Sequence, residues 1–254
     1  GMVLCPLASG LHAVLVPTMK FIKRPACWME LMSKYKATIT FAPNFAYGLA
    51  VKRTKPEKVA QLELSQVRIL GCGAEPNHPG TLRAFAEHFA PAGLKPEAIL
   101  PVYGMAEATL AMSFNRLDQE LRTDVVDAKV YQDDGRAISV DGEGLESEDP
   151  KSLEFVSCGW ALPRHAVTII DDAGQALSDR CVGEIVFSGP SVTPGYFENE
   201  EATSKAFHGD SVRTGDLGYL VNGELFVTGR AKDLIIRSGH NIDPAMIENA
   251  MSTH

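Results

Sequence analysis

Several short runs of this sequence set a charged or aromatic side chain beside glycine, a combination suited to binding phosphates or a nucleotide. The run Tyr103–Thr109 (Tyr-Gly-Met-Ala-Glu-Ala-Thr) follows a strand-like stretch and is predicted to open a helix. Gly104 would let the backbone turn there, so that Glu107 projects from the carboxyl end of a strand, where open α/β sheets bind ligands. One such carboxylate suits a magnesium ion, which keeps several waters. The alternative is a lone glutamate that only complements a helix dipole.

A second run, Gly71–Pro76 (Gly-Cys-Gly-Ala-Glu-Pro), also follows a strand-like stretch. Its two glycines would let main chain approach a planar ligand closely. Glycine-rich turns are common, however, and a simple strand-to-helix turn would also explain them. Cys72 lies between the glycines, but no histidine and aspartate arrangement accompanies it, so we expect a small buried residue rather than a nucleophile.

Two later runs add groups that could hold a sugar or a phosphate. In Thr214–Gly218 (Thr-Gly-Asp-Leu-Gly), Asp216 can accept hydrogen bonds from both hydroxyls of a ribose, or it can bond only to its own turn. Thr228–Asp233 (Thr-Gly-Arg-Ala-Lys-Asp) supplies a guanidinium, an ammonium and a carboxylate. A solvated hairpin end is the alternative for this run.

The elements that would position these runs alternate, in the first half of the chain, between short β-branched stretches and helical patterns. This favours a sheet covered by helices, in the α/β class. Strands are predicted at residues 13–16, 38–41, 67–71 and 98–102. Helices are predicted at residues 25–35 and 79–90, where apolar side chains recur at helical spacing: Trp28, Leu31, Met32 and Tyr35 in the first and Leu82, Phe85, Ala86 and Phe89 in the second. We expect the aromatic residues among them in the core.

The second half begins with a change of character. Residues 115–150 are polar, and seven carboxylates face one arginine within residues 133–149, so we expect a solvated insertion or long loop. Strand-like runs resume at residues 154–157, 166–170, 183–188, 219–220, 224–228 and 234–237. Asn222-Gly223 predicts a tight hairpin, because both central positions of such a turn favour positive φ. A helical pattern at residues 244–251 closes the chain.

Composition narrows the classes of function. A formal net charge of −8 over 254 residues argues against a broad grip on nucleic acid or anionic lipid, since both need a basic surface. No apolar run reaches the roughly 18 residues of a membrane helix, and no secretory signal is evident. The five cysteines are widely spread and show no zinc-site spacing. We therefore expect a cytoplasmic protein with no integral membrane segment.

Taken in order, the runs resemble the motifs of the adenylate-forming superfamily, which includes acyl-CoA synthetases, fatty acyl-AMP ligases, luciferases and peptide-synthetase adenylation domains. Tyr103–Glu107 resembles its Tyr-Gly-x-(Thr/Ala)-Glu motif. Residues 183–197, with Gly-Glu-Ile, Gly-Pro-Ser and Pro-Gly-Tyr-Phe, resemble the next, and Thr214–Leu217 and Gly229-Arg230 complete the series. The resemblance implies helix-flanked sheets with a β-rich subdomain: residues 1–230 as a partial N-terminal adenylation domain with an insertion at 115–150, and residues 231–254 as the hinge and the start of a C-terminal domain.

The resemblance also implies roles for the motif residues. ATP and magnesium would be the cofactors, with Glu107 on the metal ion, Tyr103 stacked on adenine, and Asp216 and Arg230 on the ribose. Lys232 matches the hinge about which the family's small domain rotates between its two steps. The implied catalytic residues are Glu107, Arg230 and Lys232, and the implied nucleotide-binding residues are Gly73, Ala74, Glu75, Pro76, Tyr103, Gly104, Met105, Ala106, Asp216 and Arg230.

Within the superfamily, Arg24–Trp28, Ala42–Tyr47 and Gly73–Pro76 resemble fatty acyl-AMP ligases, and so does the segment after Thr109. In those ligases an insertion there is thought to restrict the domain movement that coenzyme A needs, so that the acyl group passes to an acyl carrier protein. By contrast, Arg237–Pro244 is more similar to acyl-CoA synthetases, so coenzyme A is the alternative acceptor. The substrate would be a fatty acid whose tail enters an apolar channel near Phe45, Tyr47 and Met105.

Two parts of the family's machinery are not evident in the sequence. No Ser/Thr/Gly-rich phosphate loop with a lysine precedes Tyr103, and the late catalytic lysine would lie beyond His254. We therefore expect this chain alone to bind nucleotide weakly at best and to have little or no adenylation activity. A non-catalytic remnant that serves as a binding or interaction module is the alternative hypothesis. An NAD-type nucleotide binder is disfavoured, because no Gly-x-Gly-x-x-Gly opens a helix after the first strand.

Overall fold

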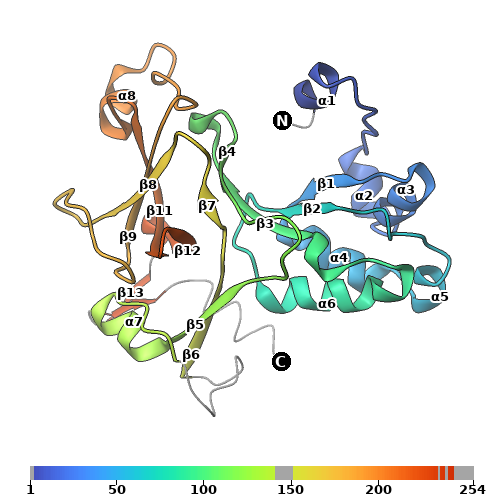
Figure 1. Cartoon of the computed structure of the whole chain (residues 1–254). Helices are drawn as coiled ribbons and strands as arrows, with labels where there is room; N and C mark the ends of the chain where they lie inside the picture. Colours follow the sequence, from blue (N-terminus) through green and yellow to red (C-terminus); the bar gives the residue numbers. More distant parts are fainter. Residues whose placement is uncertain (1–2, 141–150, 234, 238–239, 243–254) are drawn as a thin grey trace.

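The computed structural model describes residues 3–140, 151–233, 235–237 and 240–242. One half of the molecule is built on a five-stranded sheet in the order β1-β2-β3-β4-β7 (Figure 1). The first three strands are parallel and the last two are antiparallel to their neighbours. The strands are β1 (Ile39–Ala42), β2 (Ile69–Cys72), β3 (Ile99–Gly104), β4 (Ala111–Phe114) and β7 (Trp160–Ala161).

Helices pack against the parallel part of this sheet and enclose the main core. The helices of this half are α1 (Leu4–Ala8), α2 (Thr18–Lys23), α3 (Cys27–Tyr35), α4 (Asn44–Arg53), α5 (Pro56–Val59) and α6 (Pro79–Phe89), with short 3₁₀ turns η1 (Ala90–Ala92) and η2 (Pro96–Ala98). Figure 1 shows α4 and α6 side by side along the sheet. Trp28, Tyr47 and Phe85 meet there at ring-centroid distances of 4.8–5.9 Å.

Helix α6 shows how the sequence pattern produces this packing. Pro79 begins the helix, where its missing N–H costs nothing. Leu82, Phe85 and Phe89 then recur at helical spacing, and all three side chains are fully buried. The predicted helix at residues 79–90 is thereby confirmed.

The other half is β-rich. Its main sheet has the order β10-β11-β9-β8, with β12 on the other part of β11, and every pairing is antiparallel. Its strands are β8 (Ala166–Ile170), β9 (Gly183–Ser188), β10 (Phe207–His208), β11 (Ser211–Val221) and β12 (Glu224–Arg230). Asn222 and Gly223, at φ of 52° and 79°, join β11 to β12, which confirms the predicted hairpin.

Smaller elements complete the described chain. They are η3 (Ala106–Ala108), β5 (Thr123–Asp127), α7 (Ala128–Asp134), β6 (Ser152–Val156), α8 (Glu200–Ala206), η4 (Ala231–Asp233), β13 (Ile235–Arg237) and β14 (His240–Ile242). β5 pairs with β6, and β13 pairs with β14. The helix expected at residues 244–251 lies outside the described residues.

Three expectations about elements are wrong. Residues 13–16 form no strand, because no described strand pairs with them. Val14 and Leu15 are 46% and 71% exposed. Tyr35 is 53% exposed at the end of α3 rather than in the core. The Tyr103 motif opens only the 3₁₀ turn η3, since the chain folds straight back into β4.

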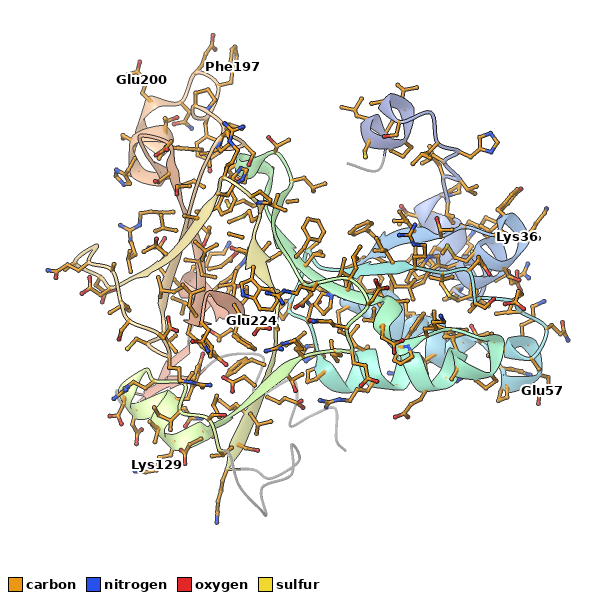
Figure 2. All side chains as sticks on the ribbon, in the orientation of Figure 1. Lys36, Glu57, Lys129, Phe197, Glu200 and Glu224 are labelled. Carbon is orange, nitrogen blue, oxygen red and sulfur yellow. The ribbon has the colours of Figure 1, made fainter. Side chains whose placement is uncertain are left out.

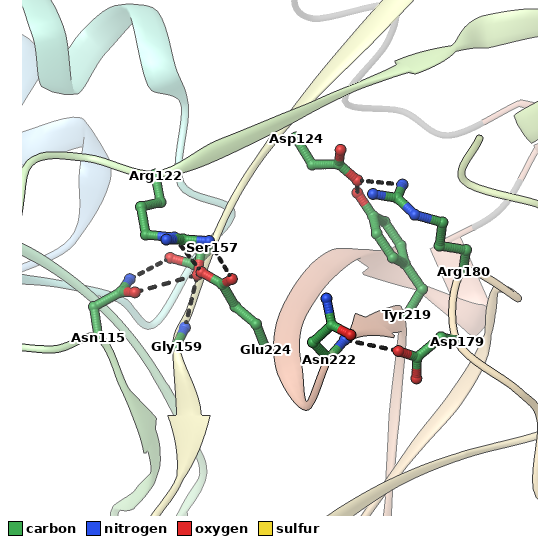
Figure 3. Close-up of polar contacts among 10 residues, drawn as sticks. All are labelled: Asn115, Arg122, Asp124, Ser157, Gly159, Asp179, Arg180, Tyr219, Asn222 and Glu224. Atoms are coloured by element: carbon green, nitrogen blue, oxygen red, sulfur yellow. Dashed lines mark hydrogen bonds and ion pairs between the residues drawn. The ribbon is translucent and has the colours of Figure 1, made fainter. Parts of the chain in front are cut away.

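The polar segment expected to be a solvated loop is partly built into the fold. It contains β5 and α7, and two buried carboxylates tie it to the β11–β12 hairpin (Figure 3). Glu224 accepts two hydrogen bonds from Arg122, both 2.8 Å long, and Ser157 Oγ donates to the same carboxylate. Residues 141–150, which hold most of the acidic run, lie outside the described residues.

The second carboxylate is Asp124, which lies on β5 two residues after Arg122. It accepts hydrogen bonds from Tyr219 Oη at 2.8 Å and from Arg180 Nη1 at 3.0 Å (Figure 3). Composition alone did not reveal these contacts, because Arg122 and Asp124 find their partners 102 and 95 residues away in sequence.

Five strands were missed by the sequence pattern: β4, β5, β7, β10 and β14. β7 and β10 are only two residues long, and β14 is three, too short to show a period of two. No helix in the described ranges combines the length and the apolar character that crossing a membrane demands.

Candidate nucleotide-binding site

Two of the predicted motifs lie side by side at the carboxyl edge of the parallel strands. Strands β2 and β3 are neighbours, with Cys72 opposite Pro101. The turn Gly73–Pro76 therefore starts beside Val102, one residue before Tyr103. This is the edge at which open α/β sheets bind ligands, as the sequence predicted.

Two residues of the later motifs, Asp216 on β11 and Arg230 on β12, form a hydrogen-bonded group with Tyr103. Tyr103 Oη donates to Asp216 Oδ2 at 2.6 Å, and Arg230 Nε donates to Asp216 Oδ1 at 3.1 Å. Burial and the negative charge of Asp216 raise the pKa of the Tyr103 phenol well above 10, so that Tyr103 stays a donor at physiological pH. The structure thus brings Tyr103 together with a carboxylate 113 positions later in the chain and with the guanidinium that this carboxylate binds.

The alignment of Asp216 with Arg230 depends on an irregularity in the hairpin. From Val221 opposite Glu224 to Gly218 opposite Val227, β11 and β12 keep one register. Thr228 is then an extra residue, so that Leu217 lies opposite Gly229 and Asp216 opposite Arg230. Without this bulge Asp216 would face Gly229, and the guanidinium would lie one position farther along the strand.

The other side of β11 is irregular at the same place. Pairing with β9 breaks between Arg213 and Leu217, and Gly215 takes a φ of 72°. Glu184 caps the break: it forms an ion pair with Arg213 and accepts a hydrogen bond from the Gly215 N–H at 3.2 Å. Between Arg213 and Leu217 the chain therefore departs from the β9 register, while Asp216 keeps its pairing with Arg230.

Glu107 occupies a separate part of the site. Its carboxylate accepts a hydrogen bond from Tyr196 Oη at 2.7 Å, and its carbonyl accepts one from the Thr193 N–H at 2.8 Å. The hydrogen bond to the Glu107 carboxylate and the charge of that carboxylate raise the pKa of the Tyr196 phenol. Within the described residues, no hydrogen bond or ion pair joins Glu107 to Asp216 or Arg230.

Glycine is required at position 104 for a different structural reason from the one predicted. Its φ is not positive, so it does not serve as a tight turn. A Cβ at Gly104 would lie 1.9 Å from the Leu110 carbonyl oxygen. Glycine is required there because the backbone of β3 passes against the start of β4.

The Gly71–Pro76 run is also explained largely by protein contacts. A Cβ at Gly71 would meet the Phe41 ring at 2.1 Å, and one at Gly73 would meet the Val102 carbonyl oxygen at 2.8 Å. Ala74 takes a φ of 71°, and Glu75 accepts a hydrogen bond from the Phe45 N–H. The two glycines thus allow close packing within the protein, and the turn is tied to the start of α4.

The remaining predicted residues have simpler surroundings. Met105 is half-buried against the cluster of Ala108, Phe187 and Phe207, Ala106 is exposed in η3, and Lys232 is exposed in η4. The expected acyl channel is not supported at Tyr47, which is fully buried and donates its hydroxyl to the Gly71 carbonyl at 3.0 Å.

Cys72 is fully buried, and burial raises the pKa of its thiol, which confirms a packing residue rather than a nucleophile. Burial likewise raises the pKa of Cys158 to about 12. Among the described residues, no cluster of three histidine, cysteine, aspartate or glutamate side chains is arranged to hold a metal ion.

Sequence reasoning missed the groups that support Glu107. Tyr196 belongs to the Pro-Gly-Tyr-Phe run but was given no role, and its neighbour Phe197 is 90% exposed and points outward (Figure 2). The tyrosine of that run could have been suspected because its motif neighbours were recognised. No local signal marked His165, whose ring contacts Ser191 in the segment that leads to Tyr196.

Curated relatives match almost the whole of this chain. A Caulobacter vibrioides protein assigned as an acyl-CoA synthetase is 40% identical over 249 residues, which are 98% of this chain and 43% of that protein. A medium-chain-fatty-acid–[acyl-carrier-protein] ligase of Teredinibacter turnerae is 36% identical, over 98% of this chain and 40% of its own length. The chain therefore spans less than half the length of the curated relatives it matches.

Solved structures give the same result. A chain from a study of the fatty acyl-adenylate ligases of E. coli and L. pneumophila superposes with a TM-score of 0.93 at 37% identity, covering all of this chain and 45% of that one. Residues 1–197 match the AMP-binding enzyme family. Because this match takes in more than half of its residues, the chain belongs to the AMP-binding enzymes.

Proposed function

We propose that this chain supplies part of the active site of an enzyme that activates a fatty acid with ATP, forming an acyl-AMP and releasing pyrophosphate. In that reaction a carboxylate oxygen attacks the α-phosphorus, a new O–P bond forms, and the bond to the pyrophosphate oxygen breaks. The enzyme must align the two reactants and offset the charge that develops on the phosphates.

The observation that carries the proposal is the group formed by Tyr103, Asp216 and Arg230. A carboxylate held by a phenol and a guanidinium, at the carboxyl edge of a parallel sheet, is suited to the hydroxyls of a ribose. The Gly73–Pro76 turn beside it would border the adenine. Lys232 would belong to the hinge and supply backbone freedom.

The donor set around Glu107 fits a magnesium ion. One carboxylate oxygen is held by Tyr196, and the other, Oε2, has no hydrogen bond or ion pair within the described residues. Magnesium usually takes one or two protein carboxylates and keeps several waters, so a single glutamate oxygen is sufficient. When bound, the ion would offset charge on the phosphates.

For the second step, we propose an acyl carrier protein as the acceptor, with coenzyme A as the alternative. The similarity to a named acyl-carrier-protein ligase supports the first, and the similarity to a protein assigned as an acyl-CoA synthetase supports the second. Supplying a labelled fatty acid and ATP to the full-length protein, with both acceptors in parallel, separates the two.

Calorimetry with a nonhydrolysable acyl-AMP analogue tests the proposed function. We expect the wild-type chain to bind the analogue and Asp216→Ala to weaken binding at least about tenfold, because a hydrogen-bonded charge contributes roughly 1.5–3 kcal/mol.

The matched control is Asp172→Ala, since Asp172 is an exposed aspartate in the turn after β8. It should bind like the wild type. Equal affinity of Asp216→Ala and the wild type would contradict the proposal.

A further inference from the structure

The loop from Gly189 to Tyr196 contacts the Glu107 segment at three points. Thr109 Oγ1 donates to the Ser191 carbonyl at 2.9 Å, the Thr193 N–H donates to the Glu107 carbonyl at 2.8 Å, and Tyr196 Oη donates to the Glu107 carboxylate at 2.7 Å. The position of the Glu107 carboxylate therefore depends on the position of this loop.

The other side of the same loop is held by His165, at the start of β8. The ring Nε2 lies 2.9 Å from Ser191 Oγ and accepts a hydrogen bond from the Ser191 N–H at 3.3 Å. The ring itself stacks on the buried Phe187, with centroids 5.2 Å apart and planes 13° apart. Histidine, loop and Glu107 thus form one connected series of contacts.

The hydrogen-bond partners also assign the form of the imidazole. The Ser191 N–H can only donate, so Nε2 must be an acceptor. The Pro163 carbonyl, 3.0 Å from Nδ1, can only accept, so Nδ1 must carry the proton. His165 therefore directs the lone pair of Nε2 at the loop.

A steric observation supports the same link independently. A Cβ at Gly189 would lie 2.3 Å from His165 Cδ2, so the ring presses directly on the first residue of the loop. The pair of Ser191 and His165 is not a nucleophile and base, since the main-chain N–H of Ser191 shares the same nitrogen and the ring is held flat against Phe187.

We propose that His165 and Tyr196 are positioning residues for Glu107: His165 holds the loop in place, and Tyr196 fixes one carboxylate oxygen so that the other faces the magnesium-bound nucleotide. This inference rests on the proposed function. It differs from a purely structural role because it predicts a loss confined to magnesium-dependent binding, while the ribose group around Asp216 stays intact.

The experiment uses the 254-residue chain and three variants. His165→Gln can keep an acceptor at the position of Nε2, His165→Ala removes it, and Tyr196→Phe removes only the hydroxyl. The matched controls are His12→Ala and Tyr35→Phe, whose side chains are exposed and far along the chain from the Glu107 segment and from residues 189–196. Calorimetry measures affinity for the acyl-AMP analogue and for ATP with and without magnesium.

We expect His165→Ala and Tyr196→Phe to bind the analogue within about twofold of the wild type, and to lose about tenfold in affinity for ATP with magnesium, which is the size of one hydrogen bond to a charged group. His165→Gln should recover most of this loss. Hydrogen exchange should also quicken at residues 189–196 and 105–110 in His165→Ala, and not in the controls.

Each contrary outcome has a distinct meaning. If His165→Ala and Tyr196→Phe lost the same affinity for the acyl-AMP analogue as for ATP with magnesium, the two residues would have only a structural role and the inference would be overturned. Unchanged hydrogen exchange at residues 105–110 in His165→Ala would also overturn it. The inference would also be overturned if the wild type bound the analogue but its affinity for ATP did not rise on adding magnesium. No analogue binding by the wild type would contradict the proposed function instead, and the exchange result would still decide whether His165 holds the loop.

Discussion

At the scale of single residues, the candidate site combines motif residues that were visible in the sequence with partners that were not. Tyr103, Asp216 and Arg230 were all selected from their motifs, and they form one hydrogen-bonded group. Tyr196 and His165 were given no part, yet Tyr196 holds the Glu107 carboxylate and His165 holds the Gly189–Tyr196 loop. A motif indicates which residue types are needed, but it does not show which neighbours orient them.

Gly104 offers a test at this scale. In Gly104→Ala the new Cβ would lie 1.9 Å from a main-chain oxygen, which cannot move without displacing the turn that carries Glu107. We expect a loss of about 1–3 kcal/mol or more in the free energy of unfolding, measured by chemical denaturation.

Gly80→Ala is the matched control for that substitution. Gly80 lies in the first turn of α6, where a Cβ would meet nothing within 4 Å. Removing glycine there should stabilise the protein by about 0.4–1 kcal/mol, through the unfolded chain. Similar effects of the two substitutions would show that the close approach at Gly104 is not real.

At the scale of elements, the β11–β12 hairpin organises the β-rich half. Its turn was predicted from Asn222-Gly223, but its bulge at Thr228 was not, although the bulge decides that Asp216 faces Arg230. A bulge depends on how the partner strand is held, and nothing in the Thr-Gly-Arg run marks one. The hairpin is in turn anchored through Glu224 and Tyr219 to the segment that begins at residue 115.

Arg122 tests this anchor. Glu224 is nearly fully buried, and Arg122→Ala would leave its carboxylate without its cation (Figure 3). Because the Arg122 side chain is itself half exposed, water can replace part of the interaction, so we expect a loss of about 1–3 kcal/mol. The melting temperature should fall by about 2–4 °C for each kcal/mol.

The comparison variant is Lys205→Ala, which breaks an exposed i,i+4 ion pair with Glu201. It should change stability by less than about 0.5 kcal/mol. If Arg122→Ala proved as mild as this control, the anchor would contribute no more than a surface contact.

At the scale of the whole molecule, Arg83 and Glu154 join helix α6 of the first half to the β5–β6 pair. Arg83 lies on α6 and Glu154 on β6, and they form an ion pair in which the Glu154 side chain is only 8% exposed. Burial alone would raise the pKa of Glu154, but hydrogen bonds from Arg83 and Thr123, with the charge of Arg83, lower it below 4.5.

The sign of the pH dependence follows from this lowered pKa. A carboxyl whose pKa is lower in the folded than in the unfolded state stabilises the protein above the unfolded value, and this contribution is lost as pH falls through the folded value. We expect Glu154→Gln to be less stable than the wild type near pH 7. The difference should shrink as pH falls below about 4.5, measured by urea denaturation of both proteins at each pH. A difference that stays constant down to about pH 3.5 would contradict the assignment.

The sequence by itself determined the family, the α/β class with a β-rich second part, the helix at residues 79–90 and the hairpin at Asn222-Gly223. These depend on local patterns: motif order, the periodicity of apolar residues and turn chemistry. It also selected the residues that form the ribose-binding candidate.

Only the tertiary structure decided how those residues are oriented. The Thr228 bulge, the close approach at Gly104, the contacts of Arg122 and Asp124, and the series from His165 to Glu107 all join positions far apart in the chain. Each depends on the register and packing of elements that form together, and a single sequence does not carry that information in its local pattern.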